Sequence, residues 1–273
     1  MPPKSKQAKR SAGATRKDET GLISRVETAV PRWPPLTHLP TAADLTLTSV
    51  LSNQILTITG LWTPSLCKTY VSFLSTLPLV TTPGNPKKGE AVRVNDRYQT
   101  QDAGFAEQLW SATALRDLVN SPSIDGRLFD ESEKTALWGG EVLGLNDNIR
   151  IYRYNPGQFF DQHYDDANNV VFTAPGSQSV PAKTTWTLLL YLTSPATGCQ
   201  GGETVFYPEP TSKRDPTPQP VITELDVGMA LLHRHGRDCM LHEGRKVTAG
   251  VKWVIRSDLG DSTLIVDPDL GEV

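Results

Sequence analysis

The second half of the sequence reads as a succession of short strands, and this pattern limits most strongly which folds are open to the chain. From Asn148 onward, runs rich in β-branched and aromatic residues alternate with turns, without the spacing of an amphipathic helix. The clearest runs are 149–154, 184–193, 203–207, 221–225, 229–232 and 251–255. Many short strands without intervening helices predict a double-sheet jelly roll, the double-stranded β-helix.

Two histidines and an aspartate in this half have the composition of a non-haem iron site. His163 and Asp165 lie two residues apart, so on a strand both side chains point to one face. With His242 as third ligand, two imidazoles and one carboxylate would form the facial triad that holds Fe(II) with open positions. Asp166 is a second carboxylate nearby, but strand alternation turns it to the opposite face.

A lysine in a strand-like run follows the second histidine. Lys252 lies ten residues after His242, and a lysine buried there needs an anion to remain charged. The simpler alternative is a solvated lysine whose stem covers apolar neighbours. Arg256, four residues further on the same strand face, either adds positive potential to the site or pairs with a nearby acid.

Five elements stand in order over residues 148–258. They are Arg153-Tyr154-Asn-Pro-Gly157-Gln158, His163-Tyr-Asp165, Gly201-Gly202-Glu203-Thr204, His242 and Lys252. Together they resemble the prolyl-4-hydroxylase-like branch of the Fe(II)/2-oxoglutarate dioxygenases. The two glycines are expected to allow a close backbone approach or a bulge at the rim of the barrel.

This resemblance implies a fold of the α+β class, mainly β, in which helices from the N-terminal half support the jelly roll. It implies Fe(II) bound by the catalytic residues His163, Asp165 and His242, 2-oxoglutarate as co-substrate and ascorbate as reductant. In such enzymes the position of Lys252 binds the distal carboxylate of 2-oxoglutarate. Tyr154 is similar to a tyrosine that hydrogen-bonds the co-substrate, and Thr187 is expected in the same pocket. The implied reaction hydroxylates a C–H bond and releases succinate and CO2.

The sequence leaves the substrate open between a protein side chain, with proline first, and a small molecule. Phe160 stands where some relatives have a tyrosine that contacts the peptide, which counts against peptidyl proline. From a different class of function, the chain could be a metal-binding jelly roll without catalysis. A nucleic-acid substrate is not expected, because the related demethylases use an arginine for the co-substrate and this half carries no basic stripe.

A second pair of histidines offers a rival metal site. His233 and His235 form an H-x-H pair, and Arg245 follows His235 by ten residues, which copies the spacing of His242 and Lys252. Arg245 stands in a turn-like sequence, whereas Lys252 stands in a strand pattern. The pattern therefore favours His242 as the ligand and predicts that His235 is a supporting or core residue.

The remaining sequence is divided by its composition. Residues 1–20 are basic and are expected to form a disordered tail, and residues 21–147 an N-terminal support region of helices and strands around the core at 148–258. Helices are expected to begin after Thr63 and Asp102, and the second should carry Phe105, Leu109, Leu115 and Leu118 on one face. Loops are expected at 81–89, 170–183 and 208–220. Residues 259–273, with four acids and no base, are expected to form an acidic tail or an edge strand.

The composition fits a globular protein of the cytoplasm or nucleus. The 273 residues are enough for a sizeable core, and the net charge of −3 gives no general attraction to nucleic acid or membrane. No apolar run reaches the length that spans a bilayer, and the N-terminus lacks the apolar segment of a secretory signal. The three widely spaced cysteines suit reduced thiols rather than a disulfide framework.

Overall fold

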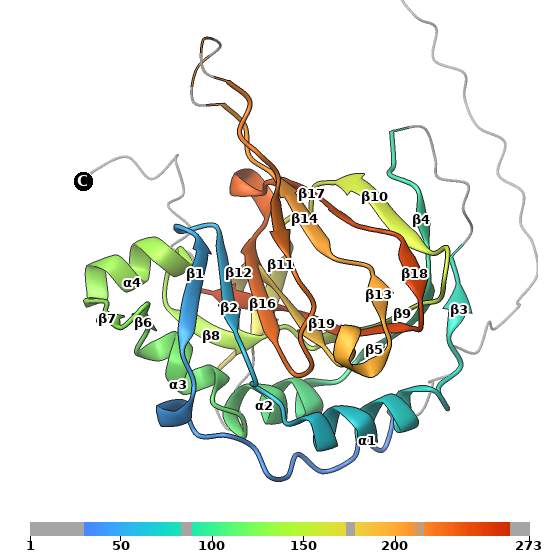
Figure 1. Cartoon of the computed structure of the whole chain (residues 1–273). Coiled ribbons are helices and arrows are strands. Elements are labelled where there is room, and N and C mark those ends of the chain that lie inside the picture. Colours follow the sequence, from blue (N-terminus) through green and yellow to red (C-terminus); the bar gives the residue numbers. More distant parts are fainter. Residues whose placement is uncertain are drawn as a thin grey trace, which may run out of the picture.

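Two β-sheets face each other and enclose the interior of the molecule (Figure 1). The computed structural model describes residues 30–82, 89–172, 178–210, 212, 214 and 216–262. Within these residues the large sheet has 12 strands and the facing sheet has five. No helix in this part of the chain is long and apolar enough to cross a membrane.

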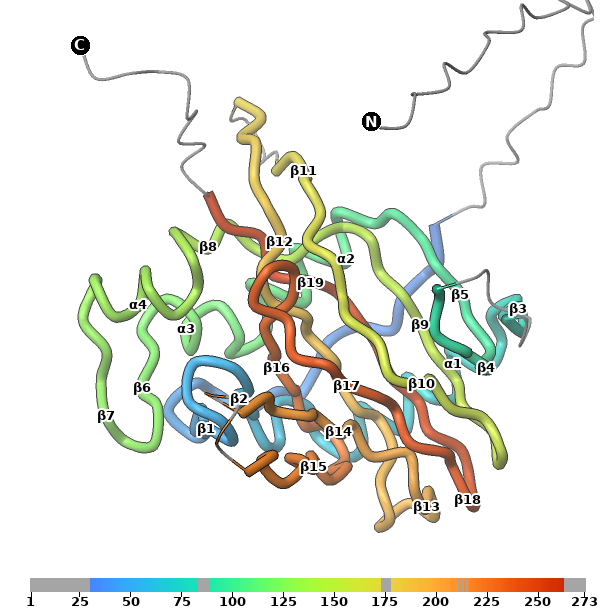
Figure 2. Tube along the Cα trace, turned by 90° about the horizontal axis from the view of Figure 1, so that it is seen from above, coloured from blue at the N-terminus to red at the C-terminus, as the bar shows by residue number. Residues whose placement is uncertain are grey.

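Eight strands form the jelly roll, and the chain passes back and forth between the two sheets (Figure 2). The large sheet contains, side by side, β9 (Asn148–Tyr154), β19 (Lys252–Asp261), β12 (Val180–Tyr191) and β16 (Ala230–Arg234). The facing sheet contains β15 (Val221–Thr223), β14 (Thr204–Tyr207), β17 (Leu241–Gly244) and β10 (Phe159–His163). This alternation is the topology of a double-stranded β-helix, so the predicted fold class is confirmed.

Shorter strands extend both sheets. The large sheet continues beyond β9 with β5 (Asp96–Gln101) and β3 (Val80–Thr81), and beyond β16 with β2 (Ile55–Ile58), β1 (Leu47–Leu51), β6 (Ser123–Ile124) and β7 (Arg127–Leu128). β8 (Val142–Leu145) pairs with β19, and β11 (Asn169–Phe172) pairs with β12. β4 (Arg93–Val94) joins the facing sheet beside β10, and β13 (Gln200–Gly201) pairs with β18 (Val247–Ala249).

Strand alternation separates two apolar cores. On β9, Ile149 and Ile151 point outward into a large cluster that includes helical residues, whereas Tyr152 and Tyr154 point inward into a smaller cluster between the sheets. On β19, Val254 faces inward with the two tyrosines. The interior between the sheets is therefore the face that can hold a polar site.

Four helices cover the outer face of the large sheet (Figure 1). They are α1 (Pro64–Leu74), α2 (Ala103–Ser111), α3 (Leu115–Asn120) and α4 (Glu131–Trp138), and three single turns are η1 (Ala42–Asp44), η2 (Pro195–Thr197) and η3 (Gly236–Asp238). The predicted helix starts are confirmed, because the side chains of Thr63 and Asp102 accept hydrogen bonds from the third residues of α1 and α2. The sequence analysis did not identify α4, although Asp130 and Glu133 form its capping box.

The second expected helix is interrupted. Phe105 and Leu109 lie on α2, but Leu115 and Leu118 lie on the separate helix α3. The Thr113 hydroxyl donates to the carbonyl of Leu109 and accepts from the amide of Leu115, so a side chain replaces helical backbone bonds at the break.

Two other expectations need correction. The loop expected at 170–183 contains the paired strands β11 and the start of β12, because Val170, Val171 and Phe172 extend the sheet. β19 continues to Asp261, three residues past the expected end of the core at 258, because Leu259 is buried beside β8 and β12. Residues 1–20, 83–88 and 263–273 lie outside the described residues, and 208–220 contains no helix or strand where it is described.

Candidate metal centre

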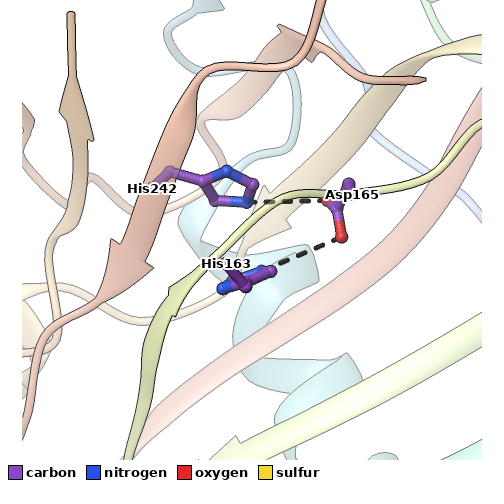
Figure 3. A group of neighbouring side chains, drawn as sticks. All are labelled: His163, Asp165 and His242. Atoms are coloured by element: carbon purple, nitrogen blue, oxygen red, sulfur yellow. Dashed lines mark ion pairs between the residues drawn. The ribbon is translucent and has the colours of Figure 1, made fainter. Parts of the chain in front are cut away.

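The structure brings the three predicted ligands together on and just beyond two neighbouring strands of the facing sheet (Figure 3). His163 is the last residue of β10, and its backbone pairs directly with His242 on the neighbouring strand β17. Asp165 lies two residues beyond the end of β10 and points back toward both histidines. The ligand atoms of the three residues all lie within 4.8 Å of one another, a spacing that suits a single ion.

Backbone carbonyls fix the orientation of both imidazoles. Nδ1 of His163 donates to the carbonyl of Asp161 at 2.8 Å, and Nδ1 of His242 donates to the carbonyl of Met240 at 2.9 Å. Nε2 of each ring then faces Asp165, at 3.8 Å from Oδ1 for His163 and 3.6 Å from Oδ2 for His242. A metal-binding histidine needs this arrangement, in which one nitrogen is hydrogen-bonded and the other presents its lone pair.

Arg256 holds Asp165 as an anion. Burial opposes ionisation of Asp165, but the charge of Arg256 and the hydrogen bond with His242 bring its pKa well below the usual range. Arg256 is itself buried and also contacts Asp258 on the same strand. Of the two roles left open for Arg256, the structure shows the pairing with nearby acids, and the guanidinium also lines the cavity between the sheets.

Without a metal, the pKa values of the two histidines are shifted in opposite directions. Burial and the neighbouring His242 lower the pKa of His163 to about 3. Burial also opposes protonation of His242, but its hydrogen bonds to Asp165 and Cys239 outweigh burial and raise its pKa to about 9. At neutral pH, His242 therefore carries the proton that a metal ion has to displace.

Lys252 is buried at the other end of the interior. It pairs across the sheet with Tyr154, and its Nζ donates to the carbonyl of Gly202 at 2.5 Å. Nζ also lies 5.4 Å from the centre of the Tyr154 ring and 5.2 Å from that of Tyr191. Burial lowers the pKa of Lys252 to about 8. In the described part of the chain no carboxylate lies within ion-pair distance of this cation.

Gly202 leaves room for the side chain of Lys252 because it has no Cβ. Its φ is +79°, and a Cβ there would lie 3.1 Å from Cδ of Lys252 and 3.0 Å from Cγ2 of Val247. At Gly201, a Cβ would lie 2.4 Å from the carbonyl oxygen of Lys246. The expected close backbone approach at the two glycines is therefore confirmed, and it leaves room for Lys252 to cross beneath the turn.

The triad and Lys252 line the same small cavity of about 40 Å³ between the sheets. Tyr154 lines this cavity as well. A larger cleft of about 910 Å³ shares His163, Asp165 and Arg256 with the small cavity and gives access from outside. Phe160 belongs to both, and its ring stacks on His163 with 3.5 Å between centres.

Other candidates fall outside this cavity or take different roles. Thr187 is fully buried and does not line the cavity; its hydroxyl donates to Asp165 at 3.3 Å and contacts His235. His235 lies behind Thr187 with both ring nitrogens in hydrogen bonds, to Thr187 and Thr184. Arg245 is half exposed beside Glu243, and Asp166 is exposed. Neither His235 nor Arg245 reaches the triad.

The sequence analysis did not place His233 at this site. This residue lines the cavity, with Nε2 at 3.8 Å from Oδ2 of Asp165. The sequence shows His233 only as one member of an H-x-H pair. Its position depends on the pairing of β16 with β12, where His233 lies opposite Thr187.

The fold is a jelly roll, and its inner cavity is lined by two imidazoles, one carboxylate and one buried cation. These features define the class of protein: a jelly roll with a candidate facial-triad metal centre. Residues 149–257 match the sequence model of the 2OG-Fe(II) oxygenase superfamily. A search of curated proteins found no match to the sequence.

Several solved structures are similar to this chain. The viral collagen prolyl hydroxylase of Paramecium Bursaria Chlorella virus-1, in complex with 2OG, is 16% identical, with a TM-score of 0.46 over 76% of this chain and 96% of that one. A prolyl hydroxylase from Trichoplax adhaerens, in complex with a peptide of hypoxia inducible factor, is 16% identical, with a TM-score of 0.48 over 77% and 84%. HygX from Streptomyces hygroscopicus, with nickel and 2-oxoglutarate bound, is 15% identical, with a TM-score of 0.43 over 77% and 83%.

Proposed function

We propose that this protein is an Fe(II)- and 2-oxoglutarate-dependent dioxygenase that hydroxylates a C–H bond and releases succinate and CO2. The observation that carries the proposal is the shared cavity, which has three metal-ligand side chains and the buried cation Lys252 in its lining, with no carboxylate paired to this cation among the described residues. A dicarboxylate that chelates the metal through one end and reaches Lys252 with the other would satisfy both features. The superfamily match supports this choice.

The residues present fit the metal and the co-substrate. His163, Asp165 and His242 would hold Fe(II), because their orientation is fixed by backbone carbonyls and by Arg256. Bound iron and 2-oxoglutarate supply the oxidising chemistry, in which O2 gives one oxygen atom to succinate and one to the hydroxylated product. Ascorbate would serve as the reductant that keeps the iron in its ferrous state.

The protein itself contributes charge, position and exclusion of water. Lys252 would bind the distal carboxylate beneath the Gly201–Gly202 turn, with Tyr154 and Tyr191 closing the pocket around it. Thr187 would help to orient the metal ligand Asp165, since its hydroxyl donates a hydrogen bond to that carboxylate and does not line the cavity. The apolar residues around this end of the interior keep the effective dielectric low, so each charge interaction is stronger than in water.

The substrate would enter through the larger cleft. Its lining includes Arg93, Tyr164 and Gln162 near the triad, a polar and aromatic surface that suits either a side chain of a protein or a small molecule. Prolyl hydroxylation is the first protein reaction to test, because of the resemblance in the sequence motifs. Phe160, stacked on His163, has no hydroxyl for a peptide contact.

The decisive experiment measures succinate formation with Fe(II), 2-oxoglutarate and ascorbate, with and without candidate peptides and small molecules. Wild-type protein is expected to form succinate, and Asp165→Asn to form none, whereas the matched control Asp166→Asn, whose side chain lines only the larger cleft, should retain the basal rate measured without substrate. Mass spectrometry of the product formed under ¹⁸O2 then identifies the hydroxylated substrate. Metal binding without any succinate formation would instead identify a non-catalytic metal-binding jelly roll.

A further inference from the structure

Four arginines line the larger cleft beside the metal centre. They come from four strands of the two sheets: Arg93 on β4, Arg97 on β5, Arg150 on β9 and Arg256 on β19. Arg97 pairs directly with Tyr152, which points between the sheets, so the two side chains share this face. Arg150 lies two residues before Tyr152 and opposite Arg256, which places it on the same face. The cleft therefore concentrates positive charge between the sheets.

Two of these arginines are balanced by carboxylates and two are not. Arg256 is paired with Asp165 and Asp258, and Nη2 of Arg150 lies 3.2 Å from Oδ2 of Asp258. The arginines on β4 and β5 have no carboxylate within ion-pair distance in the part of the chain that the structure describes. Fixed positive charge without a counter-charge attracts an anion into the cleft.

The guanidinium of Arg97 is incompletely satisfied. Its Nη2 donates to Oε1 of Gln99, but its Nε is buried without a hydrogen-bond partner. Burial lowers the pKa of Arg97, and the charges of Arg93, Arg150 and Arg256 lower it further. An arginine remains protonated despite such shifts, so the cleft holds cations that repel one another and a donor that lacks an acceptor. A bound anion would relieve both conditions.

Arg93 brings the second unpaired guanidinium close to the metal centre. Its backbone pairs with that of Phe160 on β10, and its guanidinium carbon lies 5.0 Å from the centre of the Phe160 ring. The same ring stacks on His163, with 3.5 Å between the centres. One aromatic ring therefore separates Arg93 from a metal ligand, so a compact molecule whose anionic group binds here can also reach the metal centre.

The acidic residues of the cleft limit the kind of anion that fits. Besides Asp165, the lining includes Glu90 and Asp166, both of which are exposed. Acids and bases therefore alternate along the lining, and they do not form the basic stripe that follows a nucleic-acid backbone. Arginine binds carboxylate and phosphate oxygens through its planar fork of donors. The cleft suits a single anionic group of one of these two kinds.

We propose that the substrate carries an anionic group, a carboxylate or a phosphate, which Arg93 and Arg97 bind while the carbon to be hydroxylated faces the metal centre. This inference rests on the proposed function, because it names the substrate class of the same site. The anion is distinct from 2-oxoglutarate, whose distal carboxylate would bind Lys252 in the small cavity. Neither Arg93 nor Arg97 lines that cavity. An acidic protein segment and a small organic acid share the required chemistry.

The test uses the full chain in its Zn(II) form with saturating 2-oxoglutarate, titrated with benzoate and with benzamide as probes. The two probes have nearly the same shape and differ in charge, and their ring suits the aromatic side chains of the cleft. Benzoate should bind at least about tenfold more tightly than benzamide, and Arg93→Gln and Arg97→Gln should each weaken benzoate about tenfold. Arg245→Gln, at an arginine outside the cleft, is the matched control and should leave the benzoate affinity unchanged.

A second arm separates the two sources of the anion. Succinate formation above the basal rate is measured in the Fe(II) form with peptides that carry aspartate beside proline, with the same peptides carrying asparagine, and with 3-phenylpropionate. Stimulation by the aspartate peptides identifies an acidic protein segment, and stimulation by 3-phenylpropionate alone identifies a small organic acid. Equal stimulation by the asparagine and aspartate peptides would contradict the proposal.

Equal affinities of the wild type for benzoate and benzamide would overturn the proposal without any variant. A loss of 2-oxoglutarate affinity in Arg97→Gln, with benzoate unaffected, would also overturn it and assign the arginine to the co-substrate. Arg97→Lys keeps the charge and should retain part of the benzoate affinity, which covers the case in which Arg97→Gln does not fold. Failure of the wild-type Zn(II) form to bind 2-oxoglutarate would instead contradict the proposed function, so the two failures are distinguishable.

Discussion

Arg256 forms a bidentate ion pair with Asp165, with Nη1 at 3.1 Å from Oδ1 and Nη2 at 3.1 Å from Oδ2. Arg256 is buried and the side chain of Asp165 is only 11% exposed, and Arg256 also neutralises part of the charge of Asp258. The arginine therefore holds the carboxylate in position, but it also competes with a metal ion for the same oxygens. These two effects have opposite consequences for folding and for metal binding.

The first prediction follows from this competition. Arg256→Gln should lower the free energy of unfolding of the metal-free protein by about 3–5 kcal/mol, because it leaves buried carboxylates without their cation. Zn(II) should restore part of this loss, since the ion then supplies the positive charge beside Asp165. Urea titrations with and without Zn(II) measure both quantities, and Arg245→Gln, at an exposed pair, is the control. Equal losses in the two conditions would contradict the argument.

The second prediction concerns the three ligands. His163→Ala, Asp165→Ala and His242→Ala should each abolish succinate formation and weaken Fe(II) binding, because each removes one of the three protein ligands of the metal site. His235→Ala should retain measurable turnover, since that ring contacts Thr184 and Thr187 rather than the triad. Iron content after gel filtration, together with 2-oxoglutarate turnover, checks both statements. Normal iron content in His242→Ala would reverse the assignment.

The third prediction is the release of a proton on metal binding. His242 has a pKa of about 9 in the metal-free protein, so at pH 7 it is protonated, and only the neutral ring can bind an ion. The apparent affinity for Zn(II) should therefore rise up to tenfold per pH unit and level off above about pH 9. Calorimetry at pH 7 in buffers of different ionisation enthalpy should report about one proton released. Metal binding without proton release would show that His242 is already neutral.

The sequence was sufficient for the predictions that depend on local pattern. The alternation of strands gave the fold class, and the spacing of His163, Asp165, His242 and Lys252 gave a set of residues that the structure brings into one cavity. The close backbone approach at Gly201 and Gly202 was also predictable, because a positive φ and a close approach both favour a residue without Cβ.

Predictions that depend on strand register could not be made in this way. His233 and Thr187 face each other only because β12 and β16 pair in one register, and a shift of one residue would turn His233 to the outer face. The partner of Arg256 is 91 residues away in sequence, so no local pattern indicates it. The break between α2 and α3 depends on the rotamer of one threonine.

The fourth prediction concerns Lys252 and the co-substrate. Lys252→Ala should weaken the binding of 2-oxoglutarate by roughly a hundredfold or more, because a buried carboxylate that loses its cation is destabilised by about 3–5 kcal/mol. Lys252→Arg should recover part of the affinity, since the charge remains but the planar guanidinium has a different reach. Both variants should still bind Fe(II), because Lys252 is outside the triad.

The pH dependence of the same affinity gives an independent test of Lys252. The free lysine has a pKa of about 8, and a bound carboxylate would raise it, so binding takes up a proton only where the free lysine is neutral. The affinity for 2-oxoglutarate should therefore be constant below about pH 8 and fall up to tenfold per pH unit above it. Lys252→Arg stays charged and should lack this fall, which separates the lysine from other titrating groups. The measurement is a 2-oxoglutarate titration of the Zn(II) form between pH 7 and pH 9.5. Each tenfold change in affinity corresponds to roughly 1.4 kcal/mol of binding free energy. A wild-type affinity with the same pH profile as Lys252→Arg would show that Lys252 does not bind the co-substrate.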